Sequence, residues 1–282
     1  MLFQLLKKAQ KEGWAIGQFN FSTLEQLKGI VGAAKKLSSP VILGVSEGEV
    51  GYLGVKETIA LVRILEQELR FPLFLHLDHG KNLDLIKTAI NFGFDSVHFD
   101  GSSFSLKKNV KLSREIVKYA HRRKVLVEGE LGYLRGKSKL FSKERAEIKE
   151  GDLTKPEEVN DFVKKTKVDS LAVAVGNIHG IYARMPKLDF KRLKAIREKT
   201  DAFLVLHGGS GLLAKDFKKA IKFGIQKINI NTELRVAWKG ALQKNLKKSK
   251  EIKPYLVLPK VVQVIEKEVE KYIKIFNSGN KL

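Results

Sequence analysis

Apolar runs typical of buried strands alternate with amphipathic helical segments along almost the whole chain. The predicted strands lie at 15–20, 41–45, 71–77, 96–100, 125–130, 169–175, 203–207 and 227–231. The helical segments that follow them lie at 24–37, 56–70, 82–92, 107–122, 156–166, 189–199, 213–223 and 232–247. Continuous apolar strands that are each followed by a helix indicate a parallel sheet covered on both faces. Eight such units in 282 residues predict an α/β protein with a (β/α)8 TIM barrel.

Two more helices extend this pattern, an amphipathic one over 1–12 and another over 260–276. They predict an extra N-terminal helix and a C-terminal helical extension. Because no linker or internal repeat interrupts the pattern, we expect one barrel domain over 1–282. The segment 132–154 is polar and has no strand or helix period, which predicts a cover over a site or a mobile loop. A doubly wound open sheet is the alternative fold, but it brings distant strand ends together less naturally.

Three of the six histidines, His79, His179 and His207, end a predicted strand and precede a glycine. In a barrel, the C-terminal ends of the strands form the active-site face. The chain has no cysteine, so a metal ion must be held by His, Asp or Glu. Three imidazoles with one open position are typical of catalytic Zn²⁺. The sequence therefore predicts a metal centre at the ends of the third, sixth and seventh strands.

The other polar residues near these strand ends have more than one interpretation. Asp78 precedes His79, which favours proton transfer, with orientation of an imidazole as the alternative. His76 shares a strand face with Asp78 and either fills the barrel or supports the site. We expect His98 to fill the barrel and His121 to be exposed and inert.

A glycine-rich run, Gly208-Gly-Ser-Gly211, follows the seventh strand and precedes a helix. Its amides and the Ser210 hydroxyl predict a phosphate cradle, as loops after strands seven and eight of barrels often form one. A flexible turn is the alternative. Asn229 and Asn231 alternate on the eighth strand before Thr232 and offer polar groups to the same loop.

The formal net charge of +22 is high and could attract phosphorylated ligands or nucleic acid. The lysines are spread over nearly all predicted helices, which is typical of solvated helix faces, so we do not expect a nucleic-acid partner. No apolar run approaches the roughly 18 residues of a membrane span, and the N-terminus lacks the pattern of a signal peptide. We expect a cytoplasmic protein without a membrane partner.

With these features assembled, the chain resembles the class II, zinc-dependent fructose-bisphosphate and tagatose-bisphosphate aldolases over nearly its whole length. The resemblance is carried by Phe19-Asn20, Gly44-Val-Ser-Glu-Gly48, His76-Leu-Asp-His79, Phe99-Asp-Gly-Ser102, Glu128-Gly-Glu-Leu-Gly132, Gly176-Asn-Ile-His-Gly180, His207-Gly-Gly-Ser-Gly211 and Lys227-Ile-Asn-Ile-Asn-Thr-Glu233. Number, order and spacing together make these motifs specific.

The resemblance implies that His79, His179 and His207 hold Zn²⁺ or another divalent metal, with Glu130 as an alternative ligand. It implies that Asp78 moves the proton of the substrate's C4 hydroxyl. The residues that would hold the dihydroxyacetone phosphate portion are Gly180, Gly208, Gly209, Ser210, Asn229, Asn231 and Thr232. Ser46 would face the phosphate of the aldehyde portion, a monovalent cation would lie near the phosphate loop, and the assembly would be a homodimer or homotetramer.

Two motifs of these aldolases are changed in this chain. Ser138 stands where relatives carry a loop glutamate that exchanges the proton on the enediolate carbon. Glutamates of the long segment that could replace it are Glu144, Glu147 and Glu150. Lys253-Pro-Tyr255 replaces an Asp-Pro-Arg whose arginine reaches the distal phosphate, and Lys253 offers only a point charge there.

The expected activity is reversible cleavage of a ketose 1,6-bisphosphate, with fructose 1,6-bisphosphate as the first expected substrate. Breaking the carbon–carbon bond leaves an enediolate that a divalent cation stabilises, so no Schiff-base lysine is needed. Tagatose 1,6-bisphosphate or another phosphoketose is one alternative. A barrel that retains the metal and phosphate sites but serves as a binding or regulatory protein is the other, because the loop glutamate is missing.

Overall fold

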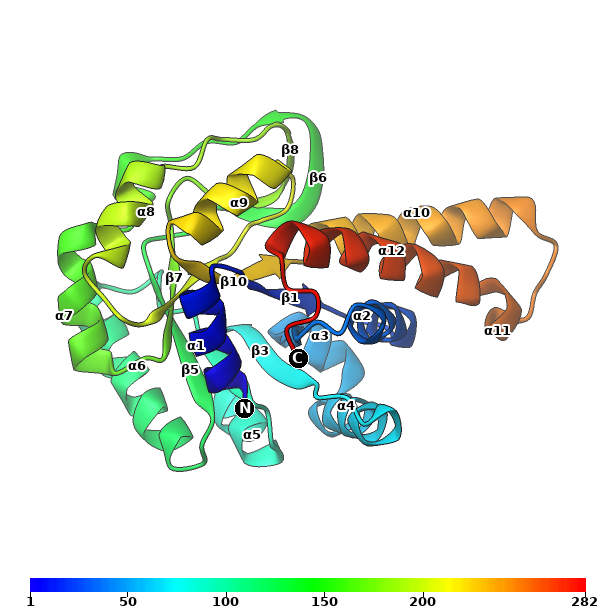
Figure 1. Ribbon diagram of the computed structural model, residues 1–282, viewed down its shortest axis with the longest axis horizontal. Helices are drawn as coiled ribbons and strands as arrows, with labels where there is room; N and C mark the ends of the chain where they lie inside the picture. The colour runs from blue at the N-terminus through cyan, green and yellow to red at the C-terminus, as the bar shows by residue number, and fades with distance from the viewer.

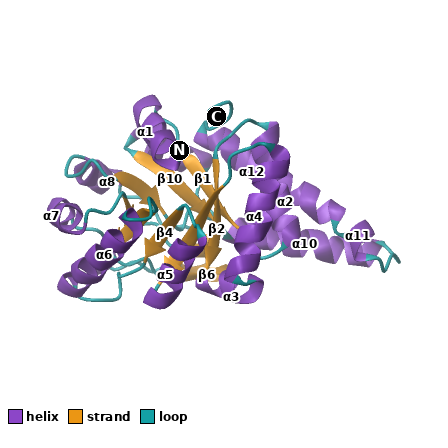
Figure 2. Ribbon diagram, turned by 90° about the horizontal axis from the view of Figure 1, so that it is seen from below, coloured by secondary structure: helices purple, strands orange, loops and turns teal.

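The protein forms a closed barrel of eight parallel strands surrounded by helices (Figures 1 and 2). The computed structural model describes residues 1–282, apart from the side chains of 142–145. The barrel strands are β1 (Ile16–Asn20), β2 (Val41–Ser46), β3 (Phe74–Gly80), β4 (Ser96–Phe99), β5 (Leu126–Leu131), β7 (Ser170–Val173), β9 (Phe203–Leu206) and β10 (Ile225–Ile230). Each strand pairs with its neighbour in sequence order, and β10 closes the barrel against β1. The predicted TIM barrel is confirmed.

The helices outside the barrel cover the outward apolar faces of the strands, as Figure 2 shows. They are α2 (Leu24–Lys36), α4 (Val55–Leu69), α5 (Leu83–Phe92), α6 (Leu106–His121), α7 (Pro156–Thr166), α8 (Phe190–Arg197), α9 (Ala214–Lys222) and α10 (Thr232–Lys248). The predicted helices therefore exist, with ends shifted by a few residues. The sequence pattern missed the short α3 (Glu47–Leu53), which Ser46 and Glu49 begin with a capping box.

The predicted N-terminal helix is α1 (Leu2–Glu12), and it closes one end of the barrel. Its apolar face, with Leu2 and Leu6, packs against Ile16, Ile42 and Phe203 at the beginnings of three strands. Burial of this end leaves the C-terminal ends of the strands as the open face, where a barrel carries its site. The predicted C-terminal extension consists of α11 (Pro254–Val257) and α12 (Pro259–Phe276), and with α10 it forms an arm that projects from the barrel (Figure 1).

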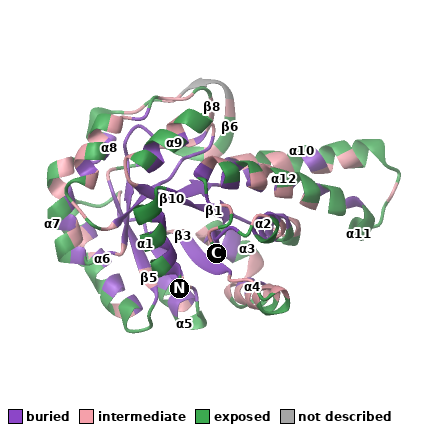
Figure 3. Ribbon diagram, viewed as in Figure 1, coloured by how far each residue is buried: buried purple, intermediate pink, exposed green. Residues whose placement is uncertain are grey.

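The barrel interior is polar on its open half. Asp78 on β3, Glu128 on β5, and Lys227 and Asn229 on β10 are all buried. They contact one another, since Lys227 pairs with Glu128 and Asn229 donates to Asp78. The apolar core lies instead between the strands and the helices, where purple marks buried residues in Figure 3. The inside of the barrel is therefore a hydrogen-bonded network that leads up to the open face.

The segment 132–154 contains a strand that the sequence pattern missed. β6 (Gly136–Arg145) pairs in parallel with β8 (His179–Arg184) in a small sheet outside the barrel, seen side by side in Figure 1. The pattern failed here because the partner strand lies some forty residues away, and Phe141 stacks on Tyr182 only across this pairing. The predicted sixth strand is also shorter, since β7 ends at Val173, so His179 begins β8 rather than ending a barrel strand.

Candidate metal centre and active site

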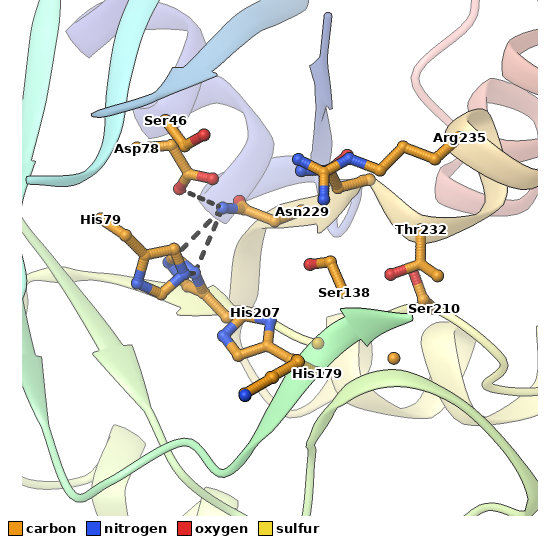
Figure 4. A pocket seen from close by; sticks show the side chains of 14 residues that line it. Ser46, Asp78, His79, Ser138, His179, His207, Ser210, Asn229, Thr232 and Arg235 are labelled. Carbon is orange, nitrogen blue, oxygen red and sulfur yellow. Dashed lines mark hydrogen bonds between the residues drawn. The ribbon is translucent and has the colours of Figure 1, made fainter. Parts of the chain in front are cut away.

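A cavity of about 320 Å³ opens at the C-terminal ends of the barrel strands (Figure 4). Its lining residues come from six strands or strand ends and from α10. They are Ser46, Asp78, His79, Lys137, Ser138, His179, Gly180, His207, Gly208, Ser210, Asn229, Asn231, Thr232 and Arg235. Glu130 lines a neighbouring cavity of about 250 Å³ that shares His79 and His179. Of the predicted site residues, only Gly209 lines neither cavity; it packs against the backbone of Asn229.

Two of the predicted ligands face each other across the cavity. His79 Nε2 lies 3.0 Å from His207 Nδ1. The other nitrogen of each ring contacts a carboxylate: His79 Nδ1 lies 3.3 Å from Asp100, and His207 Nε2 lies 2.6 Å from Glu128. A carboxylate on one ring nitrogen fixes the proton there and directs the lone pair of the other nitrogen outward, as in metal-binding histidines. These two rings fit a metal ion at the facing nitrogens.

His179 reaches the same place from β8, outside the barrel. Its ring centroid lies 4.9 Å from that of His79 and 6.3 Å from that of His207, and Figure 4 shows the three rings gathered at one wall of the cavity. It stands further out than the group of Asp78, His79, His98 and His207, whose potential ligand atoms lie within 4.8 Å of one another. His179 is therefore a candidate ligand from the rim of the site.

Glu130 occupies the opposite edge of the His79 ring. Its Oε2 lies 3.9 Å from His79 Nδ1, and its potential ligand atom groups with those of His79 and Asp100. The side chain is only 1% exposed. In this arrangement the carboxylate does not face the nitrogens that His79 and His207 turn toward each other.

Burial and neighbouring charges shift the pKa values of the three histidines in different directions. Burial lowers the pKa of His79, but the Asp78 charge and the hydrogen bond with Asp100 outweigh it and raise this pKa to about 9. Burial and the charge of His79 lower the pKa of His179 to about 3 and hold that of His207 well below its ordinary range. His179 and His207 are thus neutral at physiological pH, the state that a metal ligand requires.

Asp78 is held by two amides at the centre of the cavity. Asn20 Nδ2 donates to one carboxylate oxygen over 2.9 Å, and Asn229 Nδ2 donates to the other over 3.1 Å. Burial disfavours the charged carboxylate, but the charges of His79 and His207 lower the pKa of Asp78 well below its ordinary value. A fixed, ionised carboxylate beside a metal site can accept a proton from a bound hydroxyl group.

The opposite side of the cavity is built for an anion. Gly208 adopts a φ of +58°, and a Cβ there would lie 2.5 Å from the carbonyl oxygen of Ile178, so only glycine fits. α10 begins at Thr232 with no side chain capping its amides, so the positive end of a 17-residue helix faces the cavity. Ser210 adds a hydroxyl to the same wall. Backbone amides, a hydroxyl and a helix N-terminus together are typical of phosphate binding.

The sequence pattern missed two cationic residues of the cavity, Arg235 and Lys137. Arg235 lies one turn after Thr232 on α10, a helical spacing that could have revealed it, and it pairs with Glu49 over 2.7 Å. Lys137 and Ser138 come from β6 and line the cavity, so Ser138 occupies the place where the resemblance leads us to expect a glutamate. Lys137 could not be placed without the β6–β8 pairing.

The proposed replacements for the missing motifs lie elsewhere or outside the described part. Glu147 lines neither of the two cavities, and Glu150 is exposed and pairs with Arg192. The side chain of Glu144 lies outside the described residues. Tyr255 lies on α11 at the tip of the projecting arm and is 69% exposed. The lysine and arginine residues that line the first cavity are therefore Lys137 of β6 and Arg235 of α10.

The remaining histidines agree with their predicted places. His76 is buried inside the barrel and lies 2.7 Å from Ser96. His98 is fully buried there as well. His121 lies on the surface at the end of α6, where it contacts Asp169 over 2.9 Å.

Comparison with known proteins identifies the family. The model of the family "Fructose-bisphosphate aldolase class-II" matches residues 1–281. The chain is 41% identical to the 6-phospho-5-dehydro-2-deoxy-D-gluconate aldolase of Shouchella clausii, over 98% of this chain and 94% of that one. It is 38% identical to the fructose-bisphosphate aldolase of Staphylococcus aureus, over 99% of this chain and 97% of the other.

Solved structures agree with this assignment. The YdjI aldolase of Escherichia coli K12 matches with a TM-score of 0.87 and 31% identity, covering 100% of this chain and 98% of that one. A fructose-bisphosphate aldolase from Campylobacter jejuni, at 24% identity and a TM-score of 0.85 over 100% and 95% of the two chains, shares the fold. The chain therefore belongs to the class II fructose-bisphosphate aldolase family, whose members depend on a metal ion, and is an aldehyde-lyase.

Proposed function

We propose that the protein reversibly cleaves a phosphorylated ketose into dihydroxyacetone phosphate and an aldehyde, with Zn²⁺ held by His79, His179 and His207. The observation that carries the proposal is the pair of facing nitrogens of His79 and His207, 3.0 Å apart, in one cavity with Asp78 and the anion-binding loop. Metal ligands, an ionised carboxylate and a phosphate cradle are the three parts that such a cleavage requires.

One group of residues in the cavity binds the phosphate end of the substrate. The loop from Gly208 to Ser210 and the N-terminus of α10 bind the phosphate of the dihydroxyacetone portion, together with Gly180 and the polar groups of Asn229, Asn231 and Thr232. This anchoring sets the distance between the phosphate and the metal ligands. A monovalent cation beside the same loop belongs to the proposal and would be tested by the dependence of turnover on K⁺.

Asp78 is the residue that transfers the proton of the substrate's C4 hydroxyl. Its two oxygens are oriented by Asn20 and Asn229, so its free lone pairs face the cavity, and it accepts the proton of the C4 hydroxyl as the bond between C3 and C4 breaks. The bound metal would act as a Lewis acid on the neighbouring oxygens of the enediolate. No carboxylate stands at Ser138, so the proton on the enediolate carbon is exchanged by a different group from that of related aldolases.

Two substrates are compatible with the aldehyde side of the cavity. The first is fructose 1,6-bisphosphate, because Ser46 and Arg235 line that side and provide a hydroxyl and a guanidinium for a second phosphate. The second is 6-phospho-5-dehydro-2-deoxy-D-gluconate, because a relative of that name is 41% identical and its aldehyde product carries a carboxylate instead of a phosphate. Comparison of kcat/KM for the two substrates decides between them.

We further propose that the protein assembles as a homodimer or homotetramer in the cytoplasm. The arm of α10, α11 and α12 supports self-association because it exposes apolar side chains: Leu246 is 57% exposed, Ile252 89% and Leu256 50%. Apolar residues gathered on a projecting element are typical of protein interfaces. Among the described residues, no helix combines the length and apolar character needed to cross a membrane.

The decisive experiment measures cleavage of fructose 1,6-bisphosphate by zinc-loaded protein, coupled to detection of triose phosphate, with and without a chelator. The proposal expects turnover that the chelator removes, that added Zn²⁺ restores, and that Asp78→Asn abolishes while the variant still binds zinc. Zinc binding without turnover on either substrate would favour a barrel that serves only as a binding protein. Turnover that survives complete removal of the metal would refute the proposed mechanism.

A further inference from the structure

Glu49 on α3 accepts hydrogen bonds from several residues beside the aldehyde side of the cavity, and the mechanism described above gives it no role. Its side chain is 5% exposed. Oε2 accepts a hydrogen bond from the backbone N–H of Ser46 over 2.7 Å and another from Nδ2 of Asn20 over 3.0 Å. Oε1 accepts one from Nη2 of Arg235 over 2.7 Å and one from the hydroxyl of Ser22 over 3.4 Å. Each carboxylate oxygen therefore has two donors.

This carboxylate is fixed in place by groups of the protein. Glu49 lies in the first turn of α3, and the capping box joins it to Ser46. Asn20 also donates to Asp78 over 2.9 Å, so one amide group is shared by two carboxylates. A buried carboxylate that satisfies four donors stays in place when a ligand binds, because turning away would leave buried polar groups without a partner.

The two residues that offer donors to the far end of the aldehyde portion are both engaged by Glu49. Ser46 gives its N–H to Glu49, and its Oγ accepts the N–H of Glu49 over 3.4 Å, which leaves one hydroxyl proton for a ligand. Arg235 reaches from α10 toward the side of the cavity where Ser46 and Asp78 lie (Figure 4), and the charge of Glu49 balances its own. Asp78 adds another negative charge. The aldehyde side therefore has no excess of positive charge.

The other lysine or arginine that lines the first cavity is Lys137, and it lies toward the metal ligands. It also lines the second cavity, together with Glu130 and His179. The strand pairing places Gly136, its neighbour in β6, opposite His179. Lys137 therefore does not offset the charge of Glu49 on the aldehyde side.

A phosphate makes a different demand on Arg235 from a hydroxyl or a carboxylate. A guanidinium has five N–H donors, so Arg235 can keep its bond to Glu49 and still donate to a hydroxyl or a carboxylate. A phosphate ester carries up to two negative charges, and Glu49 repels both. To give a phosphate its full charge, Arg235 would have to leave Glu49, and a buried carboxylate without its cation is costly.

We propose that Glu49 is a specificity-determining residue that weakens the hold of Arg235 on a distal phosphate, so that the preferred aldehyde carries no phosphate. The substrate class is then a ketose with a single phosphate, the one on the dihydroxyacetone portion. The inference rests on the proposed function and selects among its substrates. It leaves the phosphate loop from Gly208 to Ser210 in the role described above.

The test compares kcat/KM of the zinc-loaded protein for fructose 1,6-bisphosphate and fructose 1-phosphate, which differ only in the distal phosphate, by detection of dihydroxyacetone phosphate. The proposal expects a wild-type ratio of bisphosphate to monophosphate no greater than one. Glu49→Gln should raise this ratio by about tenfold, because the amide oxygen can still accept from Ser46 and Asn20 while Arg235 loses its anionic partner. A lower ratio in the variant would show that Glu49 positions Arg235 for a phosphate and would overturn the inference. A merely structural role would lower both values and leave the ratio unchanged.

Glu47→Gln is the matched control, since it makes the same chemical change on the same helix. Glu47 accepts the backbone N–H groups of Lys81 and Asn82 over 2.7 Å each and lines neither of the two cavities, so its variant should keep the wild-type ratio. The double variant Glu49→Gln/Arg235→Ala identifies the cause. A gain for the bisphosphate that disappears without Arg235 supports the proposal, whereas a gain that persists would overturn it.

The wild-type measurement does not depend on the folding of any variant. Cleavage of both fructose phosphates with a preference for the bisphosphate would overturn this inference and leave the proposed function intact. Zinc-loaded protein that cleaves neither of them, nor 6-phospho-5-dehydro-2-deoxy-D-gluconate, would overturn the proposed function itself, and with it this inference.

Discussion

Lys227→Met should cause a large loss of stability, because it leaves a carboxylate inside the barrel without its cation. Lys227 Nζ lies 2.6 Å from Glu128 Oε2, and the two side chains are 3% and 1% exposed. The other oxygen of Glu128 accepts a hydrogen bond from the N–H of His207 Nε2 over 2.6 Å. One glutamate therefore balances a charge and fixes the tautomer of a candidate metal ligand.

The size of the effect follows from this geometry. At 2.6 Å and an effective dielectric constant of about 20, the gross attraction of the pair is about 6 kcal/mol, and desolvation of both groups opposes it. Burial raises the pKa of Glu128, but the Lys227 charge leads the opposing interactions and lowers it to about 2 from 4.5, which corresponds to about 3 kcal/mol in favour of the carboxylate. Removal of one partner should therefore lower the free energy of unfolding by about 3–5 kcal/mol.

The assay is urea-induced unfolding of the metal-free protein at pH 7, followed by circular dichroism. The double variant Lys227→Met/Glu128→Gln carries no unpaired charge, and its glutamine can still accept the His207 proton, so it should recover at least about 2 kcal/mol of the loss. Lys81→Met is the control for a loss of charge: Lys81 lies 3.4 Å from Asp100 but is 58% exposed, and its removal should cost less than about 1 kcal/mol. A loss below about 1 kcal/mol for Lys227→Met, or no recovery in the double variant, would refute the reasoning.

The same pair predicts a pH dependence. The pKa of Glu128 lies lower in the folded protein, about 2, than its ordinary value of 4.5. Its contribution to stability is therefore fully present above about pH 4.5 and is lost as the pH falls toward 2. Comparison of wild-type and Glu128→Gln unfolding at pH 7 and pH 3 checks the sign, because the glutamine variant should lose less stability between these two values.

Three further changes test other parts of the site. Asp78→Asn should lower kcat by at least about a hundredfold with zinc content unchanged, since an amide accepts no proton; equal turnover would remove Asp78 from the mechanism. Arg235→Ala should raise KM for fructose 1,6-bisphosphate by about tenfold or more, whereas Arg235→Lys, which keeps a positive charge, should raise it less. An unchanged KM in steady-state assays would exclude a contact between Arg235 and the distal phosphate. Tyr272→Phe should cost about 1 kcal/mol at pH 8, because the hydroxyl donates to Glu233 over 2.9 Å. Burial and the Glu233 charge raise the pKa of Tyr272 well above its ordinary value, so wild-type stability from this group is lost as the pH rises above about 10, and urea unfolding at pH 9 and pH 11 should show a smaller decline in the variant.

The barrel could be predicted because each of its units carries a local signal. Continuous apolar strands, amphipathic helices and polar strand ends are visible within about thirty residues, and the pairing of consecutive parallel strands follows from the handedness of the connections. His79 and His207 were placed correctly for this reason: one lies in β3 next to its last residue and the other follows β9 directly. A residue at a strand end needs no long-range information to be placed on the open face.

His179 and Lys137 could not be placed in this way, because they depend on a pairing between distant segments. β6 and β8 form no part of the barrel, and their register brings Gly136 opposite His179. Gly180 is required here because a Cβ would lie 2.6 Å from the carbonyl oxygen of Lys137. The sequence shows that a glycine follows the histidine, but it does not show that the backbone of β6 packs against this glycine.

The hydrogen-bond network inside the barrel could not be predicted from the sequence either. Alternation along a strand predicts which face a side chain lies on, but it does not predict which side chain of another strand it contacts. Glu128 and Glu130 lie two residues apart on β5, so alternation puts them on the same face of the strand, yet their partners differ. Glu128 bonds to Lys227 and His207, whereas Glu130 faces His98. The difference arises from which strand lies opposite at each level of the barrel, a property of closure and stagger rather than of β5 itself.

Charge balance connects this interior network to the metal. The carboxylates of Asp78, Asp100, Glu128 and Glu130 are all buried near His79 or His207, and Lys227 is the one buried lysine among the described residues. Buried carboxylates require nearby positive charge, and His79 supplies some of it by keeping a proton, which is why its pKa is raised to about 9. A divalent cation at the His79 and His207 nitrogens would replace that proton and add a second positive charge where the carboxylates are densest. The polar interior therefore favours an ion of charge two over a neutral filling of the barrel, and Asp78, one of the residues that create this preference, lines the cavity itself.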